Sequence, residues 1–268
     1  MKKIIFSDID RTLAIEEVIS DKNKKAIEEY IKKGGLFVLV SGRSVSYTKI
    51  IANKLKGIRY IICTNGSIIY DLKDNKIIYS NKISYDSLAK VYELCNENNF
   101  KFIMTGIDKD LVNKDPLNNQ EIFNIFDKNL YESIDVTQIV VYGSSKDKII
   151  NIENMINKIE DIEVINKNRA LYDKTYVSNK NYWLDVASSN TNKGSAVKKL
   201  CNLLNIDLKD TVRIGDDLND LPMFLDKGLN VAVDNAMQDL KNKADFITLS
   251  CKDDAIAHLI EKIINNEL

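Results

Sequence analysis

The sequence predicts an α/β fold, a doubly wound parallel sheet into which a smaller α+β domain is inserted. Short apolar runs alternate with amphipathic helical patterns at both ends of the chain, which is typical of βαβ units with helices on both faces of a parallel sheet. The alternation stops after residue 66 and resumes at residue 192, which indicates a separate module between them. The chain has 268 residues, and this length favours two cores because a single core stops growing near roughly 250–300 residues.

The first stretch of the chain consists of alternating strand-like and helix-like segments. One helix presents Ile27 and Ile31 on its apolar face and ends at two glycines. Residues 67–70 and 76–79 flank a polar turn, which predicts a β-hairpin. The strands expected before this hairpin are residues 4–7, 36–40 and 60–63, and the helices are residues 21–33 and 44–55.

The inserted module is expected to combine helices with an open antiparallel sheet. Residues 108–120 are polar, contain Pro116 and predict an exposed loop. The expected helices are residues 86–98 and 146–159, and the expected strands are residues 101–104, 138–142 and 182–186. The predicted domain boundaries are residues 1–82 and 189–268 for the first domain and residues 83–188 for the insertion.

Strand-like and helix-like segments alternate again in the last part of the chain, as in a parallel sheet. The expected strands are residues 211–214, 230–233 and 245–248, and the expected helices are residues 192–204, 218–226, 237–242 and 253–264.

The composition is that of an ordinary soluble globular protein. Hydrophobic residues make up 44% of the chain and charged residues 29%, and the formal net charge is -1. This balance argues against nucleic acid as a partner. The apolar runs are only strand-sized, so none can span a bilayer, and two aspartates interrupt the apolar N-terminus that a signal peptide would need. We therefore expect a cytoplasmic protein.

The four cysteines are widely scattered and form no C-x-x-C pair. No histidine is placed to complete a zinc site with them. Reduced, buried thiols are therefore expected rather than a disulfide framework. The positions are Cys63, Cys95, Cys201 and Cys251.

Two acidic clusters follow apolar runs at distant points in the chain. Asp8 and Asp10 end the first expected strand, where one carboxylate can act as a nucleophile and the other as a proton donor. Such a pair taken alone is more readily explained by a turn or a helix cap. A second cluster at residues 215–220, again directly after an apolar run, suggests that the two share a metal site.

Two further loops carry residues that suit an anion. Loops at the carboxyl ends of the strands converge on one crevice in a doubly wound sheet. Ser41, Gly42 and Arg43 open one helix, and Lys193 and Gly194 open another. Backbone N–H groups at a helix N-terminus bind anions, and a lysine adds a positive charge. Together the two loops predict a phosphate cradle, although each alone would be a helix cap or a solvated lysine.

These four segments, in this order, resemble motifs one to four of the haloacid dehalogenase (HAD) superfamily. More narrowly, the chain resembles the Cof-type phosphatases, which have a Rossmann-like core and a type IIB cap between the second and third motifs. The likeness covers nearly the whole chain. It is carried by residues 8–12, 41–43, 192–194 and 215–220, with smaller similarities at residues 64–66, 235–236 and 244–245.

The resemblance implies a Mg²⁺-dependent phosphatase that hydrolyses small phosphorylated metabolites, with sugar phosphates as the expected class. It implies that Asp8 is the nucleophile, which forms an aspartyl-phosphate, and that Asp10 is the acid and base. The Asp8 carboxylate, the Asp10 backbone carbonyl and Asp216 would hold Mg²⁺, which prefers oxygen ligands. The implied phosphate-binding residues are Ile9, Ser41, Gly42, Lys193 and Asn219, and the implied supporting residues are Thr12 and Asp220.

Arg11 and Asp234 depart from the family pattern. Both positions are commonly glycine in close relatives, and a long cation at position 11 is expected to narrow the substrate range. Asp217 is expected to face away as a cap, and Arg43 to support local structure.

Two other functions fit the same residues. A phosphotransferase or mutase would use the same aspartyl intermediate and pass the phosphoryl group to an alcohol rather than to water. A signalling receiver would also gather acids, a hydroxyl residue and a lysine, but such modules are single compact domains. The sequence leaves open the physiological substrate and the oligomeric state.

Overall fold

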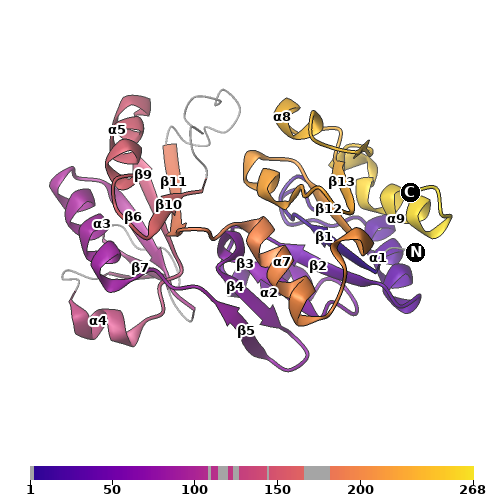
Figure 1. The fold of residues 1–268 in the computed structure, drawn as a ribbon, viewed down its shortest axis with the longest axis horizontal. Coiled ribbons are helices and arrows are strands. Elements are labelled where there is room, and N and C mark those ends of the chain that lie inside the picture. Colours follow the sequence, from indigo (N-terminus) through magenta and orange to yellow (C-terminus); the bar gives the residue numbers. More distant parts are fainter. Residues whose placement is uncertain (1–2, 108–109, 114–119, 123–126, 144, 166–181) are drawn as a thin grey trace. The chain divides into compact units, whose positions relative to one another are not determined.

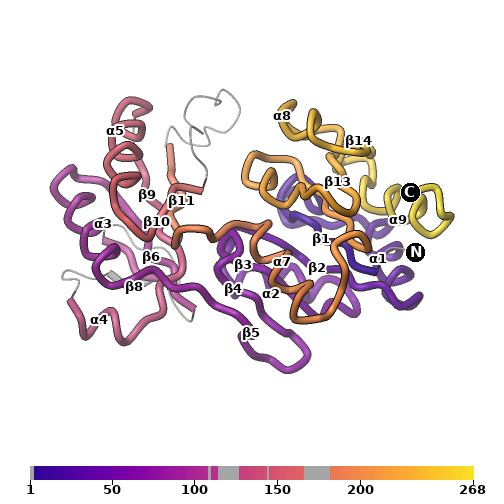
Figure 2. The backbone as a smooth tube through the Cα atoms, in the orientation of Figure 1, coloured from indigo at the N-terminus to yellow at the C-terminus, as the bar shows by residue number. Residues whose placement is uncertain are grey.

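A computed structural model describes residues 3–107, 110–113, 120–122, 127–143, 145–165 and 182–268 (Figures 1 and 2). The chain forms two compact units, one made of Met1–Tyr79 with Asn192–Leu268 and the other of Ser80–Thr191. The insertion predicted at residues 83–188 falls inside the second unit. Each unit is described separately below.

The first unit is built on an eight-stranded sheet, and the predicted α/β class is confirmed. The strand order is β14-β13-β12-β1-β2-β3-β4-β5. Neighbours from β14 to β3 run parallel, and β4 runs antiparallel to β3. The strands are β1 (Ile4–Ser7), β2 (Leu36–Val40), β3 (Tyr60–Cys63), β4 (Ile68–Asp71), β5 (Lys76–Ser80), β12 (Thr211–Gly215), β13 (Leu229–Ala232) and β14 (Phe246–Ile247).

The register of the central strands brings three loops to one edge of this sheet. Ser7 at the end of β1 is level with Ile214 in β12 and with Leu39 in β2. The chain goes from β1 to β2 on one side, whereas β12 lies on the other side, so the strand order reverses next to β1. Ligand sites of doubly wound folds lie at this reversal, beyond the carboxyl ends of the strands.

The helices cover both faces of the sheet because alternate strand residues point to opposite sides. Ile4 and Phe6 of β1 pack in one apolar cluster with Val197 and Leu200 of α7 (Lys193–Leu203). The intervening Ile5 is equally buried and faces the other side. Helices α1 (Asp21–Lys32) and α9 (Ala255–Ile264) pack against each other, and α1 also contacts β2. The remaining helices of this unit are α2 (Val45–Ala52) and α8 (Gln238–Lys241).

One predicted helix of this unit has a different form. The segment expected as a helix over residues 218–226 is a 3₁₀ helix, Leu218–Met223. Pro222 lies inside it and has no backbone N–H to donate, which disfavours a longer α-helix. Short 3₁₀ helices also occupy Thr64–Gly66, Leu208–Asp210 and Cys251–Asp253.

The second unit is a six-stranded sheet with its own apolar core, in the order β10-β11-β9-β6-β7-β8. All pairs are antiparallel except β7 with β8. Its strands are β6 (Lys101–Thr105), β7 (Asp110–Val112), β8 (Gln120–Ile122), β9 (Gln138–Gly143), β10 (Ile162–Val164) and β11 (Tyr182–Ser188). The helices in its described residues are α3 (Tyr85–Glu97), α4 (Lys128–Ser133) and α5 (Lys146–Ile156).

The prediction of an exposed loop over residues 108–120 is wrong in its described part. Residues 110–112 form β7, which pairs with β6, and Leu111 and Val112 are buried in the core of the unit. The polar flanks of this segment hid a strand of three residues, which is too short to show a pattern. Residues 108–109 and 114–119 of the predicted loop lie outside the described residues.

No helix in the described parts of the chain is both long enough and apolar enough to cross a membrane. The four cysteines are buried and free.

Candidate active site

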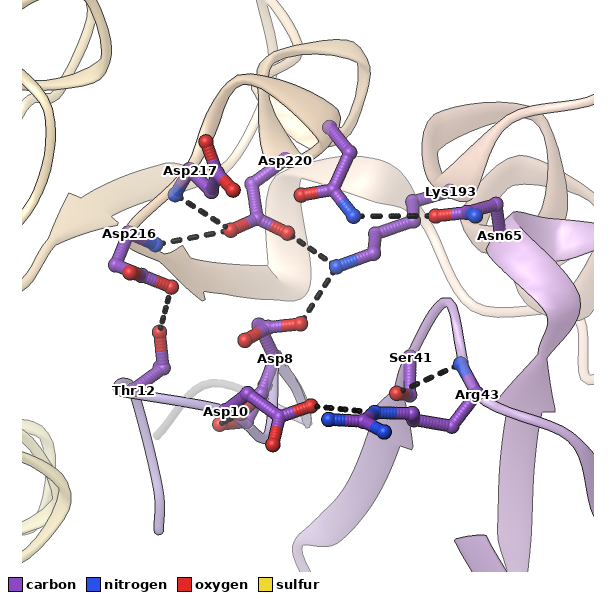
Figure 3. Close-up of polar contacts among 12 residues, drawn as sticks. Asp8, Asp10, Thr12, Ser41, Arg43, Asn65, Lys193, Asp216, Asp217 and Asp220 are labelled. Atoms are coloured by element: carbon purple, nitrogen blue, oxygen red, sulfur yellow. Dashed lines mark hydrogen bonds and ion pairs between the residues drawn. The ribbon is translucent and has the colours of Figure 1, made fainter. Parts of the chain in front are cut away.

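A buried lysine links the two acidic clusters. Asp8 follows β1, and Lys193 is the first residue of α7, where Asn192 caps the helix. Lys193 Nζ donates to Asp8 Oδ1 at 2.5 Å and to Asp220 Oδ1 at 2.6 Å (Figure 3). Its side chain is 0% exposed. These three residues are remote in the sequence and form one charged cluster in the structure.

The loop after β12 is organised around Asp220. Its Oδ2 accepts hydrogen bonds from the backbone N–H groups of Asp216 at 2.9 Å and Asp217 at 3.1 Å. A Cβ at Gly215 would lie 2.3 Å from Asp220 Oδ2, so only glycine allows this carboxylate to approach the strand end. Both oxygens of Asp220 are therefore used within the protein, by Lys193 and by the loop backbone.

Asp216 keeps one oxygen without a hydrogen bond. Its Oδ1 accepts from Thr12 Oγ1 at 3.1 Å, whereas its buried Oδ2 has no hydrogen-bond partner among the described residues. Arg11 Nε forms an ion pair with Oδ2 at 3.7 Å, which is too long for a hydrogen bond. A buried carboxylate oxygen left in this way is costly unless a cation compensates it.

Burial and mutual repulsion perturb the acids of this cluster. Burial raises the pKa of Asp8 well above its ordinary value, Lys193 lowers it, and Asp220 and Asp216 raise it further. Burial, Asp220 and Asp217 raise the pKa of Asp216 to about 7. Burial alone would lower the pKa of Lys193, but Asp220 and Asp8 outweigh it and hold the pKa above its ordinary value. Lys193 is thus a permanent cation.

The acidic cluster can accommodate a metal ion. Asp8, Asp216 and Asp220 each offer a carboxylate oxygen, and these oxygens lie within 4.8 Å of one another. Asp220 has both oxygens engaged, whereas Asp216 has a free, buried one and Lys193 contacts only Oδ1 of Asp8. Oxygen donors of this kind suit Mg²⁺ and similar hard cations. The donor set therefore fits a divalent metal, with Asp220 as a support.

Asp10 is oriented by a residue from the second loop. Arg43 Nε donates to Asp10 Oδ2 at 3.2 Å (Figure 3). The guanidinium of Arg43 also lies over the Tyr47 ring, 4.7 Å from its centroid. The Ser41 hydroxyl oxygen accepts from the Arg43 backbone N–H at 3.1 Å and holds the turn. No sequence pattern indicates the pairing between Arg43 and Asp10, because it depends on two loops that meet only in the fold.

Residues 64–66 connect the second loop with the last one. Their φ angles of 48°, 52° and 104° are all left-handed, and the first belongs to a β-branched threonine, for which this conformation is rare. The Asn65 backbone N–H donates to the Ser41 carbonyl, and Asn65 Oδ1 accepts from Asn219 Nδ2 at 3.1 Å. Asn-Gly is a strong turn signal, but only the fold shows that Asn65 contacts Asn219.

The structure thus places the predicted site residues at one edge of the sheet. Asp8, Thr12, Lys193, Asp216 and Asp220 contact one another as described. Asp10 and Ser41 are joined through Arg43. Asn219 contacts the Asn65 side chain, and the Asn65 backbone N–H donates to the carbonyl of Ser41, the neighbour of Gly42. Ile9 is fully buried between Asp8 and Asp10, and its carbonyl accepts from the N–H groups of Leu13 and Ala14.

Comparison with known proteins identifies the class to which this fold and site belong. Residues 5–260 match the family model of the haloacid dehalogenase-like hydrolases. The match covers nearly the whole chain, so the chain belongs to this family, as the four motifs predicted.

Relatives of known sequence and structure specify the class further. The 5-amino-6-(5-phospho-D-ribitylamino)uracil phosphatase YcsE of Bacillus subtilis is 29% identical over 96% of this chain and 94% of its own length. A haloacid dehalogenase-like hydrolase from Bacteroides thetaiotaomicron has a TM-score of 0.81 at 24% identity, over 98% and 100% of the two chains. The HAD subclass IIB sugar phosphatase BT4131 has a TM-score of 0.78 at 19% identity, over 97% and 98%. The protein is therefore a phosphatase of the HAD type.

Proposed function

We propose that the protein is a Mg²⁺-dependent phosphatase of small phosphorylated metabolites, sugar phosphates in particular, which acts through an aspartyl-phosphate on Asp8. The observation that carries the proposal is the contact of Asp8 with the buried Lys193, 2.5 Å away, in a cluster where Asp216 keeps a free oxygen. This arrangement provides a nucleophile, a fixed positive charge and a cation ligand within one site.

In this proposal Asp8 attacks phosphorus. A bond forms between its carboxylate oxygen and phosphorus while the bond from phosphorus to the leaving alcohol breaks. Lys193 remains charged and stabilises the negative charge on the transferring group. Asp10, oriented by Arg43, donates a proton to the leaving oxygen. The ionised Asp10 then takes a proton from the water that attacks phosphorus, and phosphate leaves while Asp8 is regenerated.

The remaining residues would hold the metal and the phosphate. The Asp8 carboxylate, the Asp10 backbone carbonyl and Asp216 would hold Mg²⁺, with Thr12 and Asp220 orienting them. When bound, a divalent ion would neutralise part of the charge that four carboxylates would otherwise direct at a phosphate dianion. The phosphate would be bound by the backbone amides of Ile9 and Gly42 and by the side chains of Ser41, Lys193 and Asn219.

The names of relatives support a small phosphorylated substrate. One is named for a phosphorylated ribitylamino uracil and another as a sugar phosphatase. We propose that residues 83–188 form the cap domain of this enzyme and that its side chains set substrate choice. We also propose a cytoplasmic location, where four free, buried thiols would be stable.

The nucleophile is tested by Asp8→Asn, which keeps the size of the side chain and removes its negative charge. We expect wild type to release phosphate from p-nitrophenyl phosphate with Mg²⁺, and we expect this release to stop when EDTA is added. The variant is expected to lose at least about a thousandfold in kcat, since a covalent route is closed. Asp21→Asn, on the exposed start of α1, is the matched control and should retain activity. An active Asp8→Asn enzyme would refute the proposal.

Substrate and acceptor are tested next. Sugar phosphates, nucleotides and other phosphorylated metabolites are compared by kcat/KM with Mg²⁺ present, and sugar phosphates are expected to rank highest. Added alcohols then compete with water for the phosphoryl group. Transfer to an alcohol at rates above hydrolysis would identify a phosphotransferase or mutase instead.

A further inference from the structure

Arg11 lies in the loop after β1, in a backbone conformation that residues other than glycine rarely adopt. Its φ of 64° is left-handed. The Arg11 backbone N–H donates to the Ala14 carbonyl at 2.8 Å, and Asn235 Nδ2 donates to the Arg11 carbonyl at 2.9 Å. Asn235 is itself fixed, because its Oδ1 accepts from the Cys251 backbone N–H at 2.7 Å. The backbone thus sets the direction in which the Arg11 side chain leaves the loop.

That direction takes the side chain to the free oxygen of Asp216. Arg11 Nε lies 3.7 Å from Asp216 Oδ2, the buried oxygen that accepts no hydrogen bond. The Arg11 side chain is 45% exposed and that of Asp216 only 3%. The contact is therefore electrostatic, and one partner can move into solvent while the other cannot.

We propose that Arg11 is a counter-cation built into the metal site. It compensates Asp216 when no ion is bound, and it opposes a divalent ion that binds the same carboxylate. This inference rests on the proposed function, because it takes Asp216 as a ligand of Mg²⁺. It concerns the affinity of the site for the ion and leaves the reaction chemistry unchanged.

The charge of Arg11 should therefore raise the stability of the metal-free protein and lower its affinity for the metal. Without metal, the charge of Arg11 stabilises the folded protein, since an uncompensated buried carboxylate is costly. With metal, the same charge repels the ion across a few ångströms, which weakens binding by about 3- to 30-fold after solvent screening. A residue that served only to hold Asp216 in place would strengthen both states, so the two roles are distinguishable.

The test is a titration of MgCl₂ into the full-length protein by isothermal calorimetry, with thermal unfolding in EDTA as the second measurement. Arg11→Gln removes the charge, and Arg11→Lys keeps it. We expect Arg11→Gln to bind Mg²⁺ about 3- to 30-fold more tightly and to unfold at a lower temperature in EDTA. Arg11→Lys should bind like wild type within about twofold.

Two further variants separate charge from other causes. Arg11→Gly also removes the charge and suits a φ of 64°, so it folds without the strain of a side chain there. It is expected to bind Mg²⁺ more tightly, as Arg11→Gln does. Lys54→Gln changes the net charge equally but at a lysine paired with Glu17, 3.7 Å away, and should leave Mg²⁺ affinity unchanged.

The possible outcomes decide between the inference and the function beneath it. If wild type binds Mg²⁺ and both charge-free variants bind it equally or more weakly, the inference alone is wrong. A gain in Arg11→Gly without a gain in Arg11→Gln would attribute the effect to the backbone and would also overturn it. Absence of Mg²⁺ binding in wild type, or binding that Asp216→Asn leaves intact, would overturn the proposed metal site as well.

Discussion

At the scale of single residues, the site depends on how each charge is compensated. Lys193 forms ion pairs with both Asp8 and Asp220, which are almost completely buried. Asp216 has a weaker partner in Arg11, at 3.7 Å, and retains a free oxygen. Burial makes such differences large, because the charged form of an unpaired acid is disfavoured away from water. Asp216 therefore has a buried oxygen left for a cation.

This difference predicts how the stability of the metal-free protein depends on pH. The pKa of Asp216 is raised to about 7, whereas aspartate in an unfolded chain titrates near about 3.9. The folded state therefore holds a proton that the unfolded state loses between these values. The contribution of protonated Asp216 to the free energy of unfolding is complete below about pH 4 and is lost as pH rises through about 7.

Urea unfolding in EDTA tests this dependence. From about pH 5 to about pH 8 the free energy of unfolding of wild type should fall relative to that of Asp216→Asn, which cannot ionise at this position. Groups remote from Asp216 titrate alike in the two proteins and cancel in the comparison. A difference between the two proteins that is constant with pH would contradict the prediction.

Arg43 is expected to position Asp10 for proton transfer. Arg43→Met removes the hydrogen bond at 3.2 Å and leaves the carboxylate free to rotate. We expect kcat to fall by about tenfold, with little change in KM, because Arg43 is not among the proposed phosphate ligands. Lys49→Met, in helix α2 directly after the loop of Arg43 and over the Tyr70 ring, is the matched control. A rise in KM at constant kcat would instead make Arg43 a substrate-binding residue.

At the scale of elements, the start of α7 packs directly on the 3₁₀ helix that carries Asn219 and Asp220. A Cβ at Gly194 would lie 1.8 Å from the Pro222 carbonyl oxygen, a backbone atom that cannot move alone. Glycine here lets the two segments approach closely enough for Lys193 to reach Asp220. Local sequence thus controls a distance between charges through backbone packing.

Gly194→Ala should therefore affect both stability and activity. We expect a loss of about 1–3 kcal/mol in the free energy of unfolding, the usual cost of overpacking. A fall in kcat is also expected, because Lys193 is the adjacent residue. Lys198→Ala, at an exposed position of the same helix, should change neither. Urea unfolding and phosphate release measure the two effects, and a fully active, fully stable Gly194→Ala would contradict the packing argument.

The prediction of elements from the sequence succeeded where strands and helices were long and periodic. The strand over Leu36–Val40 and the helix over Asp21–Lys32 were predicted within a residue. Short elements were not predicted, among them β7 at Asp110–Val112 and α4 at Lys128–Ser133, because a few residues cannot show a hydrophobic period. The 3₁₀ form of Leu218–Met223 was also missed, although Pro222 was a visible signal.

At the scale of the whole molecule, the two units have separate cores. Phe6 packs in the core of the first unit, just before Asp8, and Phe102 packs in the core of the second. All the side chains of the candidate site belong to the first unit. A change confined to the second core should therefore leave the metal site intact.

Phe102→Ala tests this separation of the two cores. We expect it to destabilise the second unit by about 3–5 kcal/mol without changing Mg²⁺ affinity. Phe6→Ala, an equal truncation in β1, should weaken Mg²⁺ binding because the strand that carries Asp8 loses its packing. Scanning calorimetry and Mg²⁺ titration of both variants provide the measurements. Weaker Mg²⁺ binding in Phe102→Ala would show that the two units are energetically coupled.

The sequence by itself determined the alternation of strands and helices, the presence of an inserted module and the types of side chain at the ends of the central strands. These are local properties, since periodicity and spacing follow directly from the order of residues in the sequence. Only the tertiary structure decided that Arg43 meets Asp10, that Asn65 meets Asn219 and that Arg11 meets Asp216. Each of these contacts joins loops far apart in the sequence, and strand register and loop conformation, rather than residue type, bring them within reach.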